Sequence, residues 1–168
     1  FNHGSTLDVP VGAGLLPDGG VLIVKDGMRK IPFLGAACAS VGSIFLNRDN
    51  REAAYASLKD AARRIVEENL QVLIAPEGTR SDDGSLGRFK AGAFHLAYEA
   101  QVPVLPIVIH GSAQLWPRTQ LAPRGGAIVI DVMPEFMVRS GDIDELRAKA
   151  NDLREKYVSY LKAGPATQ

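Results

Sequence analysis

Residues 71–81 read Gln-Val-Leu-Ile-Ala-Pro-Glu-Gly-Thr-Arg-Ser, so an apolar run passes directly into a polar loop. Such a run is typical of a strand in a sheet that is covered on both sides. Ligand-binding side chains in α/β sheets collect at the carboxyl ends of strands, which predicts a site in the loop after residue 75. The alternative is an ordinary surface turn with an ion pair.

Three residues of this loop suit an anionic ligand. Arg80 offers a planar fork of donors that matches phosphate oxygens. Gly78 allows the main chain to approach a ligand closely. Glu77 can neutralise Arg80, orient it, or accept a hydrogen bond from a substrate hydroxyl.

Four more apolar runs predict strands, and stretches with helical spacing lie among them. The expected strands are 21–24, 43–46, 104–109 and 127–132, and the expected helices are 10–16, 51–69, 91–100 and 142–162. Strands that alternate with helices indicate an α/β fold. The length fits one domain, so we expect residues 1–168 to form a single domain with a mixed central sheet that helices cover on both faces.

Composition excludes several classes of protein. The chain has 19 Lys and Arg and 19 Asp and Glu, and this balance argues against nonspecific binding of nucleic acid. Cys38 is the single cysteine, which rules out an internal disulfide. No apolar run approaches the roughly 20 residues that span a bilayer.

The chain opens with Asn2-His3-Gly4-Ser5-Thr6-Leu7-Asp8. A turn into a helix would let the two outer side chains meet, so that His3 acts as a general base and Asp8 orients it. The alternative is a turn histidine and a capping aspartate. A base at a fraying end would be poorly held, so we expect residues before Phe1, with a strand leading into Asn2, and we also consider a membrane-anchoring segment there.

Further cations stand at or near the ends of expected strands. Lys25 and Arg48 each follow a strand, and Arg88 and Lys90 follow the loop of Glu77. In a chain without net charge, this placement favours an anionic substrate, whereas each cation taken alone could simply be solvated.

Four sequence blocks follow one another: His3-x4-Asp8, Gly42-x-Ile44-Phe45-Leu46-x-Arg48, Glu77-Gly78-Thr79-Arg80 and Val102-Pro103-Val104-x-Pro106. In this order they resemble the signature of the PlsC-type glycerolipid acyltransferases, which include 1-acylglycerol-3-phosphate and glycerol-3-phosphate acyltransferases. The departures are mild. Thr6 stands where many members carry a bulkier aromatic residue, and Ala75 where many carry Phe.

The resemblance implies a glycerol-3-phosphate acyltransferase-like domain that moves an acyl group from acyl-CoA or acyl carrier protein to the sn-2 hydroxyl of 1-acylglycerol 3-phosphate. It implies that His3 and Asp8 are catalytic and that Arg80, helped by Lys25 and Arg48, binds the phosphate. The residues implied to position the acceptor are Glu77, Gly78 and Thr79.

The resemblance also implies lysophosphatidic acid and a membrane surface as partners, no cofactor and no nucleic acid, and a place on the cytoplasmic face of a membrane (the inner membrane in a bacterium). Two alternatives stay open. The acceptor could be glycerol 3-phosphate or a lysophospholipid, or the chain could be a non-catalytic lipid-binding relative.

Other enzyme classes lack their motifs. No serine sits in Gly-x-Ser-x-Gly, and both nucleotide-binding glycine motifs are absent. His3, His95 and His110 are scattered along a chain with one cysteine, so we expect no metal site. Cys38 lies among alanines and is expected to pack in the core.

Overall fold

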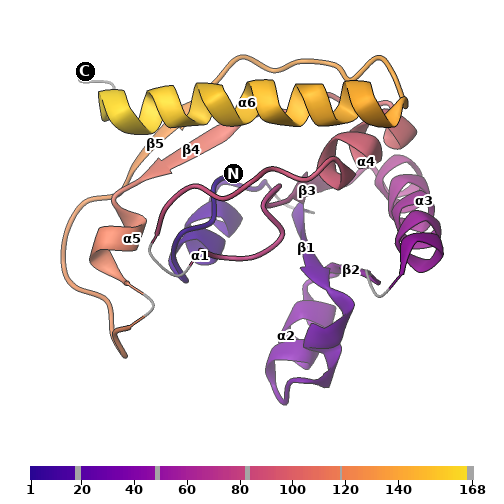
Figure 1. Ribbon diagram of the computed structural model, residues 1–168. Helices are drawn as coiled ribbons and strands as arrows, with labels where there is room; N and C mark the ends of the chain where they lie inside the picture. Colours follow the sequence, from indigo (N-terminus) through magenta and orange to yellow (C-terminus); the bar gives the residue numbers. More distant parts are fainter. Residues whose placement is uncertain (18–19, 48–49, 82–83, 118, 166–168) are drawn as a thin grey trace.

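Three parallel strands form the sheet of the N-terminal half of the chain (Figure 1). They are β1 (Gly20–Lys25), β2 (Ile44–Leu46) and β3 (Gln71–Leu73), in the spatial order β2-β1-β3. Ile23 pairs with Ile44 and Val21 with Val72, so the strands run the same way and end toward one edge. The computed structural model describes residues 1–17, 20–47, 50–81, 84–117 and 119–165.

Short helices surround this sheet. They are α1 (Asp8–Ala13), the 3₁₀ turn η1 (Asp26–Lys30), α2 (Leu34–Ser40) and α3 (Arg51–Glu67). The Asn50 side chain caps α3 by accepting a 2.8 Å hydrogen bond from the N–H of Ala53. Ala61 and Ile65 of its apolar stripe are buried against the sheet.

Two antiparallel strands form a second, smaller sheet. They are β4 (Ile107–His110) and β5 (Val129–Val132), with Ile107 opposite Val132, and the helices of this half are α4 (Gly92–Ala100), α5 (Ser112–Leu115) and α6 (Ile143–Ala163). Figure 1 shows α6 lying along β4 and β5 and reaching α4. Asp142 caps α6 by accepting hydrogen bonds from the N–H groups of Asp144 and Glu145.

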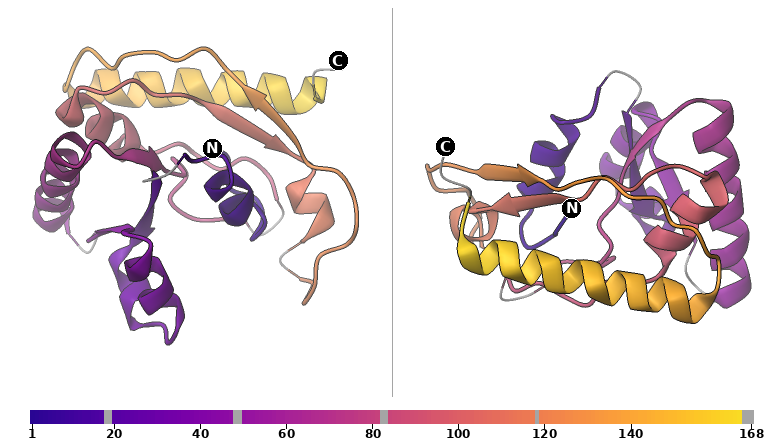
Figure 2. Two further views of the ribbon diagram at one scale, coloured as in Figure 1. Left: turned by 180° about the vertical axis from the view of Figure 1, so that it is seen from behind. Right: turned by 90° about the horizontal axis from the view of Figure 1, so that it is seen from above.

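Helix α4 joins the two halves because it contributes to both hydrophobic cores. Phe94 and Ala97 pack with β4 and α6, while Leu96 and Ala100 pack with α3 and the parallel sheet. The two views in Figure 2 show α6 and α3 on the outside of the molecule, with the start of the chain between them.

A largely apolar cavity of about 490 Å³ lies between β3 and the segment 102–107, with α1 and Phe1 on its wall. Beside it, the hydroxyl of the buried Tyr157 donates to the carbonyl of Ile107 (3.0 Å) and accepts from the N–H of Ile107 (2.9 Å). One side chain of α6 therefore satisfies both main-chain groups of Ile107 in β4.

The α/β fold predicted from the sequence is confirmed. The predicted helices 51–69, 91–100 and 142–162 recur within two residues at each end, and the first helix begins at Asp8 rather than residue 10. The strand predicted at 104–109 is shorter because Val104 forms only an isolated bridge to Phe136. In the described residues the predicted mixed sheet is divided into a parallel and an antiparallel part.

None of the helices in the described part of the chain combines the length and the apolar character that crossing a membrane requires.

Candidate active site

The start of the chain is held between the two sheets by main-chain and side-chain hydrogen bonds. The amide of Asn2 donates to the carbonyl of Ile109 (2.9 Å) and accepts from its N–H (2.7 Å). The backbone nitrogen of Phe1 donates to the carbonyl of Ile74, 3.2 Å away. Asn2 is buried, and it fixes the residue that follows it. The sequence analysis missed this role, and the position of Asn2 directly before His3 is the signal that could have revealed it.

His3 and Asp8 meet as their spacing predicts. Nδ1 of His3 lies 3.3 Å from Oδ2 of Asp8, which stands in the first turn of α1. Asp8 is fully buried, whereas 17% of the His3 side chain is exposed. With Nδ1 toward Asp8, Nε2 lies on the opposite edge of the ring. This is the arrangement of a general base with an orienting carboxylate.

The loop between these two residues holds Asp8 in turn. The N–H of Ser5 donates to Oδ2 of Asp8 (2.6 Å), and the Ser5 hydroxyl donates to the carbonyl of Trp116 just after α5 (2.9 Å). The other carboxylate oxygen of Asp8, Oδ1, is buried and has no hydrogen-bond partner in the described residues. The protein thus directs one oxygen of Asp8 toward the loop and the His3 ring.

The carboxylate of Glu77 connects the loop after β3 to His3. Oε1 accepts from the main-chain N–H of His3 (2.7 Å), and Oε2 accepts from the N–H of Gly87 (2.6 Å). Only 4% of Glu77 is exposed. Burial raises the pKa of its carboxyl, and the two N–H donors oppose that shift. A Cβ at residue 87 would lie 2.8 Å from Oε2, so glycine leaves room for this contact.

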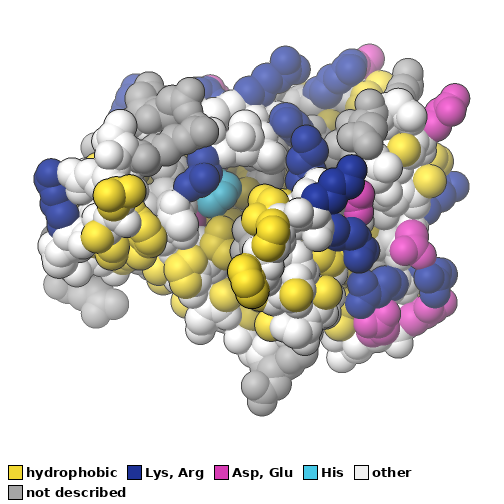
Figure 3. All heavy atoms as spheres, turned by 90° about the horizontal axis from the view of Figure 1, so that it is seen from below, with side chains coloured by type: hydrophobic (Ala, Val, Ile, Leu, Met, Phe, Trp, Pro, Cys, Tyr) yellow, Lys and Arg dark blue, Asp and Glu magenta, His cyan; other side chains and the backbone are white. Residues whose placement is uncertain are grey.

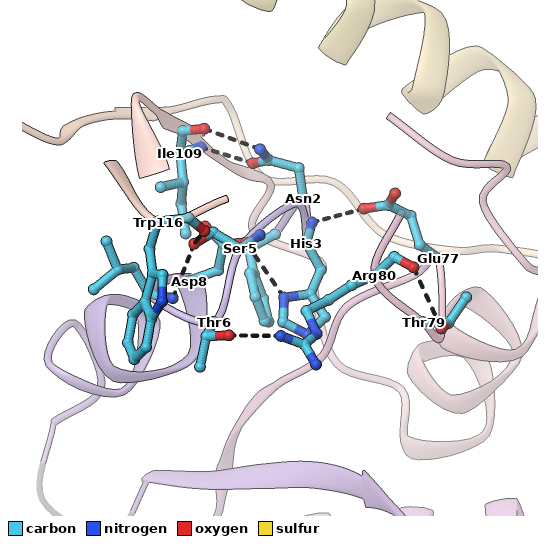
Figure 4. A network of polar contacts seen from close by, with 12 residues as sticks. Asn2, His3, Ser5, Thr6, Asp8, Glu77, Thr79, Arg80, Ile109 and Trp116 are labelled. Atoms are coloured by element: carbon cyan, nitrogen blue, oxygen red, sulfur yellow. Dashed lines mark hydrogen bonds and ion pairs between the residues drawn. The ribbon is translucent and has the colours of Figure 1, made fainter. Parts of the chain in front are cut away.

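Arg80 reaches from the same loop to the loop of His3. Its guanidinium donates to the hydroxyl of Thr6 (2.5 Å), as Figure 4 shows. Gly78 has φ +72°, a conformation that favours glycine, and its N–H donates to the carbonyl of Ala75 (3.1 Å). Thr79 is exposed beside it. His3, Asp8, Glu77 and Arg80 therefore come together from segments more than 70 residues apart.

A family model described as Acyltransferase matches residues 1–110, the part of the chain that carries these four side chains. This chain belongs to the acyltransferase family. The 1-acyl-sn-glycerol-3-phosphate acyltransferase of Limnanthes alba is 32% identical over 162 residues, which are 96% of this chain and 58% of that protein. The enzyme of the same name from Haemophilus influenzae is 33% identical over 95% of this chain and 67% of its own length.

A solved structure supports the same family membership. The crystal structure of the 1-acyl-sn-glycerophosphate (LPA) acyltransferase PlsC from Thermotoga maritima is 28% identical and superposes with a TM-score of 0.74. The match covers 99% of this chain and 66% of that one. This member of the acyltransferase family thus spans less than two thirds of the length of its plant relatives and of the solved chain.

Among the other cations predicted at strand ends, those that the structure describes make none of the contacts given above for the candidate active site. Lys25 is exposed at the end of β1. Arg48 lies outside the described residues. Arg88 and Lys90 are exposed on the wall of a second cavity of about 330 Å³, next to Ile143 at the start of α6.

Beyond the region that the acyltransferase model matches, α6 contributes one more contact to the site. Arg154 donates to the carbonyls of Gly87 (2.9 Å) and Leu86 (3.2 Å). The Gly87 peptide is therefore held by Arg154 at its carbonyl and by Glu77 at its N–H. The sequence predicts the helix at 142–162, but no local pattern marks Arg154.

The other two histidines belong to separate pairs. His110 is buried and contacts Asp131 across β4 and β5 (2.9 Å), and His95 contacts Glu99 within α4 (3.2 Å). Cys38 is buried, in agreement with core packing. In the residues that the structure describes, no cluster of three or more His, Cys, Asp or Glu could hold a metal.

Proposed function

We propose that this chain transfers a fatty acyl group from acyl-CoA or acyl carrier protein to the sn-2 hydroxyl of 1-acylglycerol 3-phosphate, which forms phosphatidic acid. The observation that carries the proposal is the pair His3–Asp8, with a buried carboxylate 3.3 Å from a partly exposed imidazole. Relatives that bear the name 1-acyl-sn-glycerol-3-phosphate acyltransferase support this choice of acceptor.

In the proposed reaction, Nε2 of His3 takes the proton of the acceptor hydroxyl as its oxygen attacks the thioester carbon. The tetrahedral intermediate then collapses, the C–S bond breaks, and the protonated imidazole returns the proton to the leaving thiolate. Asp8 fixes the tautomer of His3 and stabilises its charged form. The thioester is already activated, so the reaction needs no enzyme nucleophile and no cofactor.

Arg80 is proposed to bind the phosphate of the acceptor, because its guanidinium lies at Thr6 in the same loop as His3. Lys25 and Arg48 are proposed helpers. Gly78 and Thr79 are proposed to lie along the glycerol part of the acceptor.

We assign Glu77 a different task from the contact with the acceptor that the resemblance implies. Both of its oxygens already accept main-chain N–H groups, so we propose that it positions His3 and Gly87. Only 4% of Glu77 is exposed, which leaves little of its carboxylate open to the acceptor.

A panel of acceptors tests the function: 1-acylglycerol 3-phosphate, glycerol 3-phosphate and a lysophospholipid, each with one acyl-CoA and with acyl carrier protein as the second donor. We expect the first acceptor to give the highest kcat/KM. His3→Ala should abolish turnover, and His95→Ala, which alters the pair on α4, should not. Wild-type turnover by His3→Ala would refute the general base, and lipid binding without turnover would favour a binding protein.

The phosphate contact has its own test. Arg80→Ala should raise the acceptor KM by roughly 10–100-fold, as the loss of a charged hydrogen bond would. Arg63→Ala is the matched control, since Arg63 is an exposed arginine that pairs with Asp60 and Glu67 on α3. An unchanged acceptor KM in Arg80→Ala would refute the phosphate role.

We also propose that the enzyme works at a membrane surface, on the cytoplasmic face, because the proposed acceptor and product are lipids. Flotation of the protein with liposomes tests this location.

A further inference from the structure

The segment that links β1 to β2 forms a projection with apolar side chains on its outside. We call residues 26–41, which contain η1 and α2, the η1–α2 projection; Figure 1 shows it extending from the end of the sheet away from α6. Phe33 is 91% exposed, Val41 56% and Ile31 47%. Pro32 between Ile31 and Phe33 is exposed as well. A soluble surface rarely gathers so many large apolar groups on one short segment.

The exposed Phe33 has an unusual backbone conformation. Phe33 has φ +62°, a region that bulky residues avoid, and it stands directly before the first turn of α2. In the same segment, the Arg29 guanidinium lies 3.8 Å from the centre of the Phe45 ring, and the main chain of Gly35 contacts Arg29 so closely that a Cβ would overlap its carbonyl. The exposed aromatic ring therefore stands at a residue with a strained backbone.

Basic side chains stand next to the apolar ones in the sequence. Lys25, Arg29 and Lys30 are exposed, and Asp26 is the one acidic residue from 25 to 41, so this segment carries three positive charges and one negative, a net charge of +2. The whole chain has a net charge of zero, so the positive charge is a local property. Apolar side chains with a basic border are the composition of surfaces that enter the headgroup region of anionic bilayers.

The projection lies on the face of the molecule that Figure 3 shows. Helix α2 lies at the lower end of Figure 1, and Figure 3 views the molecule from below, where hydrophobic side chains gather. A histidine side chain is visible in the hollow beside them, with Lys or Arg side chains next to it.

We propose that the η1–α2 projection inserts Ile31 and Phe33 into the surface of an anionic lipid bilayer. A lipid surface fits better than a protein partner, because a stable protein interface needs roughly 20–30 residues a side, and the projection offers a few apolar side chains and charges. This proposal rests on the proposed function in one respect, the lipid nature of the acceptor. The exposure of Ile31 and Phe33 and the positive charge of the segment do not depend on that function.

A tryptophan at position 33 reports directly on insertion. In Phe33→Trp, emission should shift to shorter wavelength with vesicles of phosphatidylcholine and phosphatidylglycerol, and lipids with brominated chains should quench it, after subtraction of the signal of Trp116 in the wild type. Val66→Trp is the matched control, because Val66 is 60% exposed on α3, outside the projection, and its emission should not change. If vesicle-bound Phe33→Trp is not quenched, or if the protein does not bind the vesicles, the proposal is wrong.

A second variant separates docking from folding. Asn accepts a positive φ more readily than Phe, so Phe33→Asn should melt at the wild-type temperature or above it. Its partition onto anionic vesicles should fall by about tenfold, as the loss of one inserted aromatic ring implies. Lys30→Glu should weaken binding to anionic vesicles and not to neutral ones. Undiminished vesicle binding by Phe33→Asn would overturn the proposal.

Activity on two forms of acceptor separates this proposal from the proposed function. Phe33→Asn should keep the wild-type rate on a short-chain 1-acylglycerol 3-phosphate dissolved as monomers, and lose about tenfold on the same headgroup embedded in vesicles. Equal losses on both forms would refute docking. If the wild type acylates no acceptor, the proposed function fails, and the fluorescence of Phe33→Trp still decides whether the projection enters the bilayer.

Discussion

Replacing Glu77 by Gln keeps the shape of the side chain and tests whether its carboxylate holds the base. In the wild type its two oxygens accept N–H groups from His3 at 2.7 Å and Gly87 at 2.6 Å. The amide of Gln can accept only one of them, and its NH₂ group then faces the other N–H. One buried donor therefore loses its partner, either at His3 or at Gly87.

The magnitude follows from this geometry. Leaving one buried N–H unsatisfied costs about 1–3 kcal/mol. For a chain of this size, 1 kcal/mol lowers the melting temperature by about 2–4 °C, so Glu77→Gln should melt roughly 2–12 °C lower. Glu67→Gln, on the exposed face of α3, is the control and should melt within about 2 °C of the wild type, since surface changes usually stay within about 0.5 kcal/mol.

Kinetics separate the two roles that Glu77 could have. A displaced His3 main chain moves the imidazole relative to the acceptor hydroxyl, and a shift of about 1 Å can cost about 100-fold in rate. We expect kcat of Glu77→Gln to fall by roughly 10–100-fold with little change in the acceptor KM. The reasoning fails if the acceptor KM rises while kcat and the melting temperature stay at wild-type values, because Glu77 would then bind the acceptor directly.

The pH dependence of stability supplies an independent check on Glu77. Burial raises the pKa of its carboxyl above 4.5, so the folded state binds this proton more tightly than the unfolded state. The resulting stability is present in full below pH 4.5 and is lost as pH rises through the folded-state pKa. The variant Glu77→Gln does not titrate at this position, so the difference in stability between wild type and variant should shrink as pH rises above 4.5. Thermal melts at several pH values measure this difference, and a difference that grows with pH would contradict the prediction.

Three further substitutions test the framework of the site. Asp8→Asn should reduce kcat by about 100-fold or more while circular dichroism stays unchanged, because the amide no longer stabilises a protonated imidazole; a wild-type kcat would contradict the role of Asp8. Arg154→Met removes the donor to the carbonyl of Gly87, so it should lower kcat and change the acceptor KM less. Lys156→Met, at an exposed position on α6, should change neither constant. Tyr157→Phe leaves the N–H of Ile107 without its partner and should lower the melting temperature by roughly 2–12 °C with kcat unchanged. Differential scanning calorimetry measures this shift, and a melting temperature equal to that of the wild type would contradict it.

Elements with strong local signals were predictable from the sequence. The helix α3 carries an asparagine cap and an apolar stripe, and α6 carries an aspartate cap, so both begin within one residue of the predicted position. The contact between His3 and Asp8 was predictable for the same reason, since a short turn that leads into a helix brings side chains five positions apart together. Local sequence patterns predict structures that depend on a few neighbouring residues.

The partners of Glu77 could not be predicted, because they depend on contacts between distant segments. The sequence places Glu77 after a strand beside Arg80, which favours a contact with substrate or an ion pair. In the structure the carboxylate turns instead to the main chain of His3, 74 residues earlier, and of Gly87. Backbone N–H groups carry no signature in the sequence, so such partners appear only once the chain is folded.

Contacts between distant segments also hold His3, the proposed base, firmly near the start of the described chain. Three contacts from different elements fix its loop: Asn2 on β4, Ser5 on the carbonyl of Trp116, and the main chain of His3 on Glu77. Each of them uses a main-chain group, which leaves the imidazole to Asp8 and the substrate. A substitution that removes one anchor should therefore shift the geometry of the base without changing its chemistry, and its effect should appear in kcat before it appears in substrate binding.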